Sequence, residues 1–164
     1  MRSMTAVILM FAATPNVFAY HSCWQFASER YGVHEHVLKA IALTESAMDV
    51  NAINRNSNGS VDVGLMQINS QWFPQLAEMG IKPGDLWNPC TNIQVGAWVL
   101  AGEIRRFGYN WQAIGAYNAG PAKTVARERR RKQYAVRVYQ NLLRISHRTG
   151  DGLLINLSPR SRHD

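Results

Sequence analysis

The sequence predicts a single, mostly α-helical domain with at most a small β element near residues 53–64. Several long stretches carry apolar residues at the i, i+3, i+4, i+7 spacing that places side chains on one face of a helix. The alternation of apolar and polar residues that is typical of a half-buried strand occurs only at 61–65. No internal repeat divides the chain, and 164 residues are enough for one domain with its own hydrophobic core.

The N-terminal residues 1–19 have the pattern of a secretory signal peptide. Arg2 precedes the apolar stretch Thr5–Ala13, which is too short to span a membrane. Small residues follow, and we expect cleavage before Tyr20. An uncleaved anchor or a buried strand is the alternative, and Pro15 disfavours both. We therefore expect an exported protein that keeps no transmembrane anchor.

Cys23 and Cys90 are the two cysteines of the sequence. Export would place them in an oxidising compartment, where a disulfide is the default. Such a bridge would tie the first mature helix to the middle of the chain and stabilise the fold by roughly 4 kcal/mol. Neither the cysteines nor the histidines have the spacing of metal ligands, so we expect no metal and no cofactor.

The net charge of +7 comes from one segment, Arg127–Arg148, which holds eight basic residues and one acidic residue. Residues 20–126 hold seven basic and eight acidic residues. The segment suits an anionic polymer or surface, or it is the solvated face of a helix. No aromatic residue lies within Arg127–Lys132, so base stacking is not indicated and we expect no nucleic-acid partner.

The first predicted helix, Ser22–Arg30, ends at a glycine and places Cys23, Phe26 and Ala27 on one face. The segment Asp49–Ser60 is rich in Asn, Ser and Gly, which predicts a loop or a short hairpin around Asn58-Gly59. An extended stretch follows at 61–65, and Met66–Phe73 is expected to be helical or irregular. The other predicted helices are Val33–Ser46, a short one within Gln71–Asn88, Ile93–Phe107, Trp111–Asn118 and a final one at about 122–148. We expect residues 149–164 to form a flexible tail, because they show no periodicity.

Two of these helices carry more specific expectations. Ile93–Phe107 has small residues along its apolar stripe, which predicts the close approach of another helix. The final helix places Tyr134, Val138 and Leu142 on one face and several arginines on a neighbouring, exposed face.

Glu45 lies on the apolar face of the helix Val33–Ser46. Together with Leu38, Ile41 and Ala42 it follows the i, i+3, i+4, i+7 spacing. A carboxyl group among apolar side chains has a raised pKa, and a carboxylic acid that is protonated near neutral pH can act as a general acid. The alternative is that Glu45 lies in a frayed last turn and reaches water.

Gln67 and Asn69 are amides in an otherwise apolar stretch. They are either buried amides with hydrogen-bond partners or groups on a groove wall that bind the hydroxyl and acetamido groups of a sugar. Their spacing does not distinguish the two interpretations.

Four motifs occur in the order and at the spacing found in one enzyme family. They are Glu45-Ser46 at the end of a helix, GLMQIN at 64–69, AYNAG at 116–120 and a tyrosine in QYAVRVY at 133–139. From Cys23 to Leu143 the chain resembles the lytic transglycosylases of the soluble type, which are related in fold to goose-type lysozyme. The resemblance is greatest to the small exported members that accompany secretion, pilus or conjugation systems. It implies an α+β lysozyme-like fold, a periplasmic location, peptidoglycan glycan strands as substrate and partners in such a machine.

The resemblance also implies a mechanism. Glu45 would protonate the glycosidic oxygen between N-acetylmuramic acid and N-acetylglucosamine. It would then take a proton from the C6 hydroxyl of the same muramic residue, giving a 1,6-anhydro product without water. The residues implied to hold the sugar or to line the site are Ser46, Met66, Gln67, Asn69, Tyr117, Asn118 and Tyr134. For the two tyrosines, the alternative is packing in the core with a locally bonded hydroxyl group.

Asp62 departs from the simplest pattern of the family, because many transglycosylases have no second carboxylate in the cleft. It would position water for a hydrolytic muramidase reaction, as an acidic residue does in goose-type lysozymes, or it would cap the loop 58–60 by binding backbone amides. A third reading is a peptidoglycan-binding scaffold that cleaves little or nothing.

Overall fold

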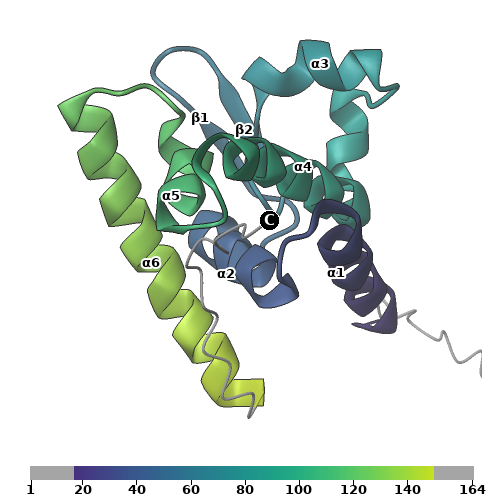
Figure 1. The fold of residues 1–164 in the computed structure, drawn as a ribbon. Coiled ribbons are helices and arrows are strands. Elements are labelled where there is room, and N and C mark those ends of the chain that lie inside the picture. The colour runs from purple at the N-terminus through teal and green to yellow at the C-terminus, as the bar shows by residue number, and fades with distance from the viewer. Residues whose placement is uncertain (1–16, 150–164) are drawn as a thin grey trace, which may run out of the picture.

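A computed structural model describes residues 17–149, and within them six α-helices pack together with a small sheet whose hairpin lies at one edge of the molecule (Figure 1). The main part of the expected signal peptide and the expected tail from residue 150 lie outside the described residues. The helices are α1 (Val17–Tyr31), α2 (Glu35–Ser46), α3 (Phe73–Glu78), α4 (Pro89–Phe107), α5 (Trp111–Ala119) and α6 (Val125–Thr149). The strands are β1 (Ile53–Arg55), β2 (Val61–Val63) and β3 (Ile68–Asn69), and the 3-10 turns are η1 (Ser70–Trp72) and η2 (Pro83–Trp87). The predicted mostly helical class is confirmed.

The core lies between α2, α4 and the inner faces of α5 and α6. The long helix α6 runs along one side of the molecule beside α5 and α2, and α1 packs against α4 (Figure 1). A disulfide between Cys23 and Cys90 joins α1 to the first turn of α4, as the sequence predicts. No helix within residues 17–149 is both long and apolar enough to cross a membrane.

Helix α2 carries the predicted apolar stripe, and Leu38, Ile41 and Ala42 are all fully buried. The helix begins after His34, whose Nδ1 accepts a hydrogen bond from the His36 backbone N–H at 3.1 Å. It ends at Ala47, which adopts a left-handed conformation and donates its backbone N–H to the carbonyl group of Ala42. Glu45 therefore stands in the last turn of a helix with a defined end.

The sheet begins with the hairpin that the sequence offered as one alternative. Strands β1 and β2 are antiparallel, and β3 pairs with the other edge of β2. The third strand was not predicted, because Met66–Phe73 was expected to be helical or irregular, so the β element extends to Asn69. The register places Asp62 on the central strand directly opposite Asn54 on one side and Asn69 on the other.

Buried Asn92 of α4 fixes the loop between β2 and β3. Its Oδ1 accepts the Met66 backbone N–H at 2.7 Å, and its Nδ2 donates to the carbonyl groups of Val63 and Leu86, each at 2.9 Å. Gly64 in this loop has φ 74°, and a Cβ atom there would collide with the Asn92 amide. Asn92 thus binds two backbone groups at the β2–β3 connection and one in η2, and so holds both segments against α4.

The small residues of α4 and α5 serve different neighbours. A Cβ atom at Gly96 would lie 2.5 Å from Sδ of Met66, so the α4 stripe receives the Met66 side chain at this position. Helices α1 and α5 pack against other parts of α4. Gly115 of α5 faces α6, where a Cβ atom would lie 2.5 Å from the Arg131 carbonyl oxygen. The close helix–helix approach is therefore between α5 and α6.

Two side-chain placements differ from the predicted faces. In α1, Phe26 was predicted to lie on the inner face together with Cys23 and Ala27, but it is 49% exposed. Trp24 is buried instead, so the face of α1 that packs against α4 differs from the predicted one. In α6, Tyr134, Val138 and Leu142 are buried as predicted, but Arg131 of the basic segment is also buried. The basic segment is therefore not uniformly a solvated face.

Candidate active site

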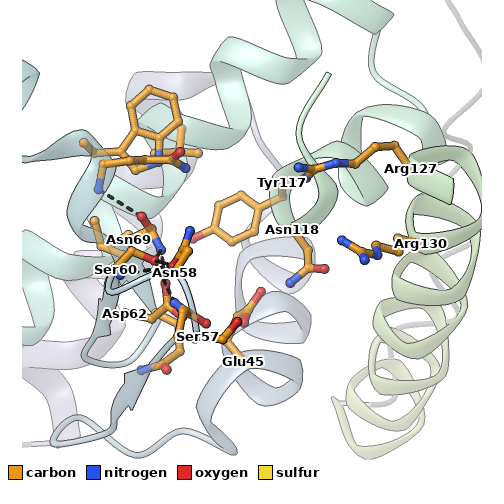
Figure 2. A pocket seen from close by; sticks show the side chains of 16 residues that line it. Glu45, Ser57, Asn58, Ser60, Asp62, Asn69, Tyr117, Asn118, Arg127 and Arg130 are labelled. Atoms are coloured by element: carbon orange, nitrogen blue, oxygen red, sulfur yellow. Dashed lines mark hydrogen bonds between the residues drawn. The ribbon is translucent and has the colours of Figure 1, made fainter. Parts of the chain in front are cut away.

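An open polar cleft of about 420 Å³ lies between the β-hairpin and the helices α5 and α6. Figure 2 shows Glu45 low in the cleft, with the hairpin side chains Ser57, Asn58 and Asp62 on one side. Asn118, Arg127 and Arg130 approach from the other side. A second hollow, of about 770 Å³, shares Trp72, Tyr117 and Asn118 with the first, so the cleft continues across the molecule.

Glu45 has the properties of a general acid. Its pKa is raised from 4.5 to about 7, mainly by burial and in smaller part by the negative charge of Asp62. A hydrogen bond from Tyr134 and the positive charge of Arg137 oppose this rise. The balance leaves a carboxyl group that lines the cleft and that keeps its proton in a substantial fraction of molecules near neutral pH.

Two stacked tyrosines lie beside this acid. Tyr134 of α6 donates its hydroxyl hydrogen to Oε1 of Glu45 at 2.6 Å, and Tyr117 of α5 donates to the Met66 carbonyl oxygen at 2.8 Å. Their ring centroids are 6.5 Å apart with a 22° angle between the planes. Burial raises the pKa of both hydroxyl groups well above the ordinary value, so they stay protonated donors. Tyr117 lines the cleft, and Tyr134 is buried behind Glu45.

The carboxylate of Asp62 is held by three side-chain amides. Asn69 donates to Oδ1 at 2.6 Å, while Asn54 and Asn56 donate to Oδ2 at 3.1 and 2.8 Å. Asn54 of β1 and Asn69 of β3 stand opposite Asp62 in the strand register, and Asn56 follows directly after β1. If Asp62 capped the loop 58–60, backbone N–H groups would donate to its carboxylate. The three donors above are instead side-chain amides. Asp62 also lines the cleft with Glu45.

The sequence left open whether Gln67 and Asn69 are hydrogen-bonded inside the protein or line a groove, and the structure shows both properties for each residue. Both line the cleft, and both have internal partners. Gln67 adopts a left-handed backbone conformation, φ 48°, and its Nε2 donates to the carbonyl groups of Gly64 and Ala52. Strained backbone of this kind occurs preferentially at functional sites. Asn69 also accepts the Gln71 backbone N–H, so its side chain is fixed in one orientation.

Ser46 and Met66 lie next to the cleft without lining it. The Ser46 hydroxyl donates to the Leu65 carbonyl group at 2.7 Å, which ties the end of α2 to the loop between β2 and β3. The Met66 side chain is fully buried against Gly96, and its backbone binds Tyr117 and Asn92. Both residues therefore hold together the segments that carry the cleft residues, and neither faces the cleft itself.

Several residues of the cleft were not predicted from the sequence. The amide partners Asn54 and Asn56 lie in a segment whose composition indicates only turn and loop. Their role follows from the strand register, which periodicity does not reveal in such short strands. Arg127 and Arg130 belonged to the basic segment, but nothing in the spacing indicated that they reach the cleft.

Within residues 17–149 no three His, Cys, Asp or Glu side chains lie together in a group that could hold a metal ion. A protonated carboxyl group, a nearby carboxylate and a wall of amides fit the acid-assisted cleavage of a glycosidic bond. The fold and the site define a lysozyme-like enzyme that cleaves glycans.

Comparison with known proteins gives the family. Residues 22–140 match the family described as Transglycosylase SLT domain. The chain therefore belongs to this family, and it is a peptidoglycan lytic transglycosylase.

Three relatives are similar over most of their length. "Invasion protein IagB" of Salmonella typhimurium is 42% identical over 124 residues, which cover 75% of this chain and 76% of that protein. "X polypeptide" of Escherichia coli is 41% identical over 138 residues, 84% of this chain and 80% of that protein. "Protein IpgF" of Shigella flexneri is 41% identical over 125 residues, 76% of this chain and 81% of that protein.

The fold is similar to that in the X-ray structure of an inactive mutant of the lytic transglycosylase Slt from Pseudomonas aeruginosa. The TM-score is 0.63, with 23% sequence identity over 82% of this chain. The chain spans 25% of that protein's length. This comparison confirms the predicted lysozyme-like fold.

Proposed function

We propose that the protein cleaves the β-1,4 bond between N-acetylmuramic acid and N-acetylglucosamine and leaves a 1,6-anhydromuramic end. The observation that carries this proposal is the position of Glu45 in the cleft, with Tyr134 bound to one of its oxygens and its pKa raised to about 7. An acid of this pKa can give up a proton and take one back within a single turnover near neutral pH.

The reaction needs no group besides Glu45 to move protons. Glu45 donates its proton to the glycosidic oxygen, and the bond from C1 of the muramic residue to that oxygen breaks. The resulting carboxylate stabilises the positive charge at C1 and accepts the proton of the C6 hydroxyl. The C6 oxygen then bonds to C1, which closes the 1,6-anhydro ring and leaves Glu45 protonated again. Tyr134 stabilises the carboxylate between the two transfers.

The remaining predicted site residues divide into two roles in this proposal. Gln67, Asn69, Tyr117 and Asn118 line the cleft and bind the sugar. Tyr134, Ser46 and Met66 hold Glu45 and the loop between β2 and β3 in place. Asp62 raises the pKa of Glu45 through its charge.

Mass spectrometry of digested cell-wall sacculi tests the proposal. The wild-type protein should release muropeptides with 1,6-anhydro ends, and Glu45→Gln should reduce the rate by about a thousandfold or more, since the acid is lost. Undiminished cleavage by the variant would exclude Glu45 as the acid. Binding of glycan by the wild type without any cleavage would support the scaffold reading.

A hydrolytic muramidase reaction is the second candidate, and the position of Asp62 in the same cleft favours it. Asp62 would accept a proton from water that attacks C1, giving a reducing end. Asp62→Asn separates the two routes. If the wild type gives anhydro ends and the variant only slows their release, Asp62 acts through charge. Reducing ends that vanish in the variant would support hydrolysis.

We further propose that residues 1–19 are removed on export and that the mature enzyme opens the periplasmic cell wall locally for a trans-envelope secretion or conjugation apparatus. The printed name "Invasion protein IagB" of one relative supports a role of this kind. N-terminal sequencing of the periplasmic protein should begin at Tyr20. Restoring secretion or conjugation in a deletion strain should require Glu45. Rescue by Glu45→Gln would contradict the proposed role.

A further inference from the structure

Arg137 of α6 is a cation near Glu45 that has no part in the two proton transfers. Its guanidinium carbon lies 5.4 Å from the centroid of the Tyr134 ring, three residues earlier on the same helix. The Arg137 side chain is exposed, and it does not line the cleft. Within residues 17–149 it forms no ion pair with a carboxylate. The charge of Arg137 is therefore directed at an aromatic ring and not at an acid.

The Tyr134 ring connects Arg137 to the proposed acid. Tyr134 is buried, its hydroxyl group donates to Oε1 of Glu45 at 2.6 Å, and its ring stacks on that of Tyr117. A cation over the face of an aromatic ring is attracted by the electrons of the ring and draws them toward itself. The phenol then becomes a better hydrogen-bond donor. The pair of Arg137 and Tyr134 therefore binds the Glu45 carboxylate more tightly than Tyr134 alone would.

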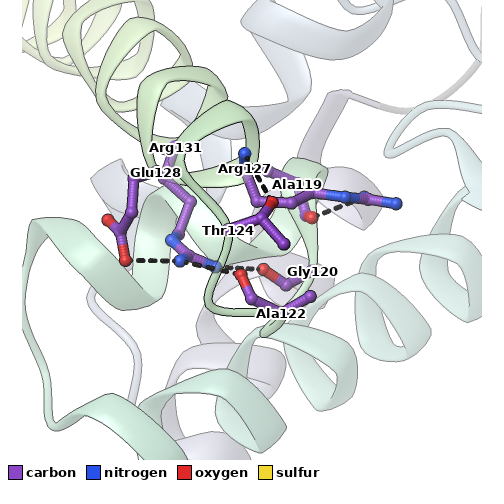
Figure 3. Close-up of polar contacts among 7 residues, drawn as sticks. All are labelled: Ala119, Gly120, Ala122, Thr124, Arg127, Glu128 and Arg131. Atoms are coloured by element: carbon purple, nitrogen blue, oxygen red, sulfur yellow. Dashed lines mark hydrogen bonds and ion pairs between the residues drawn. The ribbon is translucent and has the colours of Figure 1, made fainter.

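Helix α6 is anchored on both sides of this pair. Figure 3 shows Arg131, one turn before the pair, directed at the turn that precedes α6. Its Nη1 donates to the Gly120 carbonyl group at 2.6 Å, and its Nη2 donates to that of Ala122 at 3.1 Å. On the other side of the pair, Val138 is fully buried. The backbone that carries the pair is therefore held in one place.

Charged and titratable groups from three elements face Glu45. Burial raises the pKa of Glu45 most, and the hydrogen bond from Tyr134 of α6 lowers it. The negative charge of Asp62 on β2 raises this pKa, and the positive charge of Arg137 on α6 lowers it. The Tyr117 hydroxyl group of α5 stays neutral, because burial and the charge of Glu45 raise its own pKa well above the ordinary value. Asp62 and Arg137 thus act on Glu45 in opposite directions.

Arg127 and Arg130 of α6 line the cleft, but among the described residues they are not the cations that shift the pKa of Glu45. That cation is Arg137. A guanidinium group keeps its proton at any pH near neutrality, so its charge is constant through the reaction. The charge lowers the cost of releasing the proton from Glu45, and Arg137 itself moves no proton.

We propose that Arg137 is a positioning residue of the cleavage reaction. Its guanidinium group holds the Tyr134 phenol against Glu45 and stabilises the carboxylate that exists between the two proton transfers. This inference rests on the proposed function and adds a residue to its mechanism. Because Arg137 does not line the cleft, its effect belongs in kcat and in the pH profile, and not in KM.

The test compares variants that remove or keep the charge of Arg137. Arg137→Gln removes the cation, and Arg137→Lys keeps one that can also lie over the ring. The matched control Arg129→Gln removes an exposed arginine of the same helix that does not line the cleft. For each variant, kcat and KM on solubilised peptidoglycan strands are measured from about pH 5 to pH 9, together with thermal unfolding. Arg137→Gln is also made in a Tyr134→Phe background.

We expect Arg137→Gln to lower kcat by about fivefold with KM unchanged, an effect of the size typical of a cation–π contact. Without the cation the Glu45 carboxylate is less stable, so the alkaline limb of the pH profile should move to higher pH. Arg137→Lys and Arg129→Gln should match the wild type in both respects. In the Tyr134→Phe background, Arg137→Gln should cost less, because the phenol through which Arg137 acts is gone.

Several results would overturn the inference. They are an unchanged pH profile in Arg137→Gln, a loss that appears in KM, and an equal loss in Arg137→Lys or in Arg129→Gln. A loss from Arg137→Gln that is as large in the Tyr134→Phe background as in the wild type would also overturn it. Undiminished cleavage by Glu45→Gln would instead contradict the proposed function.

Discussion

At the scale of single residues, the properties of Glu45 depend on both its burial and its partner. Burial raises its pKa to about 7, and the Tyr134 hydroxyl group limits that rise. A buried carboxyl group of this kind is costly for the folded protein once it ionises. Function and stability therefore respond to the same proton.

The stability of the protein should depend on pH through Glu45. Its pKa is higher in the folded state, about 7, than the ordinary value of 4.5. The associated stabilisation is fully present below about pH 4.5 and is lost as pH rises through 7, by roughly 3 kcal/mol in total. Glu45→Gln cannot ionise, so we expect it to be more stable than the wild type at pH 8 and similar at pH 4. Thermal unfolding of both proteins across this range measures the difference, and a difference independent of pH would contradict the prediction.

Tyr134→Phe should move the pH dependence of catalysis. The phenol lowers the pKa of Glu45 by binding its carboxylate, so the variant should lose activity at a higher pH than the wild type does. We expect kcat to fall by about tenfold, because the carboxylate formed after the first proton transfer is less stabilised. Tyr139→Phe on the exposed side of α6 is the control and should leave the pH profile unchanged. Identical profiles for Tyr134→Phe and the wild type would argue against this role.

At the scale of elements, the site is assembled by close contacts between segments. The loop between β2 and β3 is held to α4 by Asn92, and α5 and α6 approach each other at Gly115. These contacts place Tyr117 and Tyr134 side by side next to Glu45. A small change at such a contact should affect the site without touching it.

Gly115→Ala tests this dependence. Its Cβ atom would lie 2.5 Å from the Arg131 carbonyl oxygen, so α6 must shift, and we expect a loss of about 1–3 kcal/mol in stability together with reduced activity. Gly102→Ala on α4 is the matched control, because its nearest neighbour would be 3.7 Å away. The control should be neutral or up to about 1 kcal/mol more stable, as helix propensity predicts. Equal stability of the two variants, measured by denaturant unfolding, would contradict the packing argument.

The sequence predicts the helices well where the pattern of apolar residues extends over several turns. The apolar stripe of α2 predicts the burial of Leu38 and Ile41, and the final helix buries the predicted Tyr134 face. The two-residue strand β3 is too short to show periodicity, so its pairing was missed. The contact of Asn54 with Asp62 depends on strand register, and that of Asn56 depends on the path of the loop after β1. The turn-rich composition of that segment specifies neither.

The residues of the site that were predicted from the sequence are those that stand out in a long pattern or in a motif. Glu45 stands out as the one carboxyl group on an otherwise apolar face, and Tyr117 and Asn118 lie in a motif. Arg127 and Arg131 are four residues apart on the same helix, yet Arg127 lines the cleft and Arg131 is buried. This difference depends on the path of the turn before α6. Periodicity assigns both to a basic segment and cannot separate them.

At the scale of the whole molecule, the disulfide between Cys23 and Cys90 closes a loop with a sequence separation of 67 residues. That loop contains α2 and the entire sheet. Replacing both cysteines with alanine should lower the free energy of unfolding by about 4 kcal/mol, mainly because the unfolded chain gains freedom. A reducing agent should lower the melting temperature of the wild type and leave that of the variant unchanged. Equal melting temperatures of the two oxidised proteins would show that the bridge contributes little.

The hydrogen bond between Tyr134 and Glu45 joins residues that are 89 positions apart in the chain. Synthesis and any passage through a membrane pore that starts at the N-terminus deliver the glutamate long before the tyrosine. If Glu45 is the acid, as proposed above, the catalytic group lacks its Tyr134 partner until α6 has docked. We therefore expect glycan cleavage only after the last helix has folded onto the rest of the domain, and this order of events protects the cell without an inhibitor.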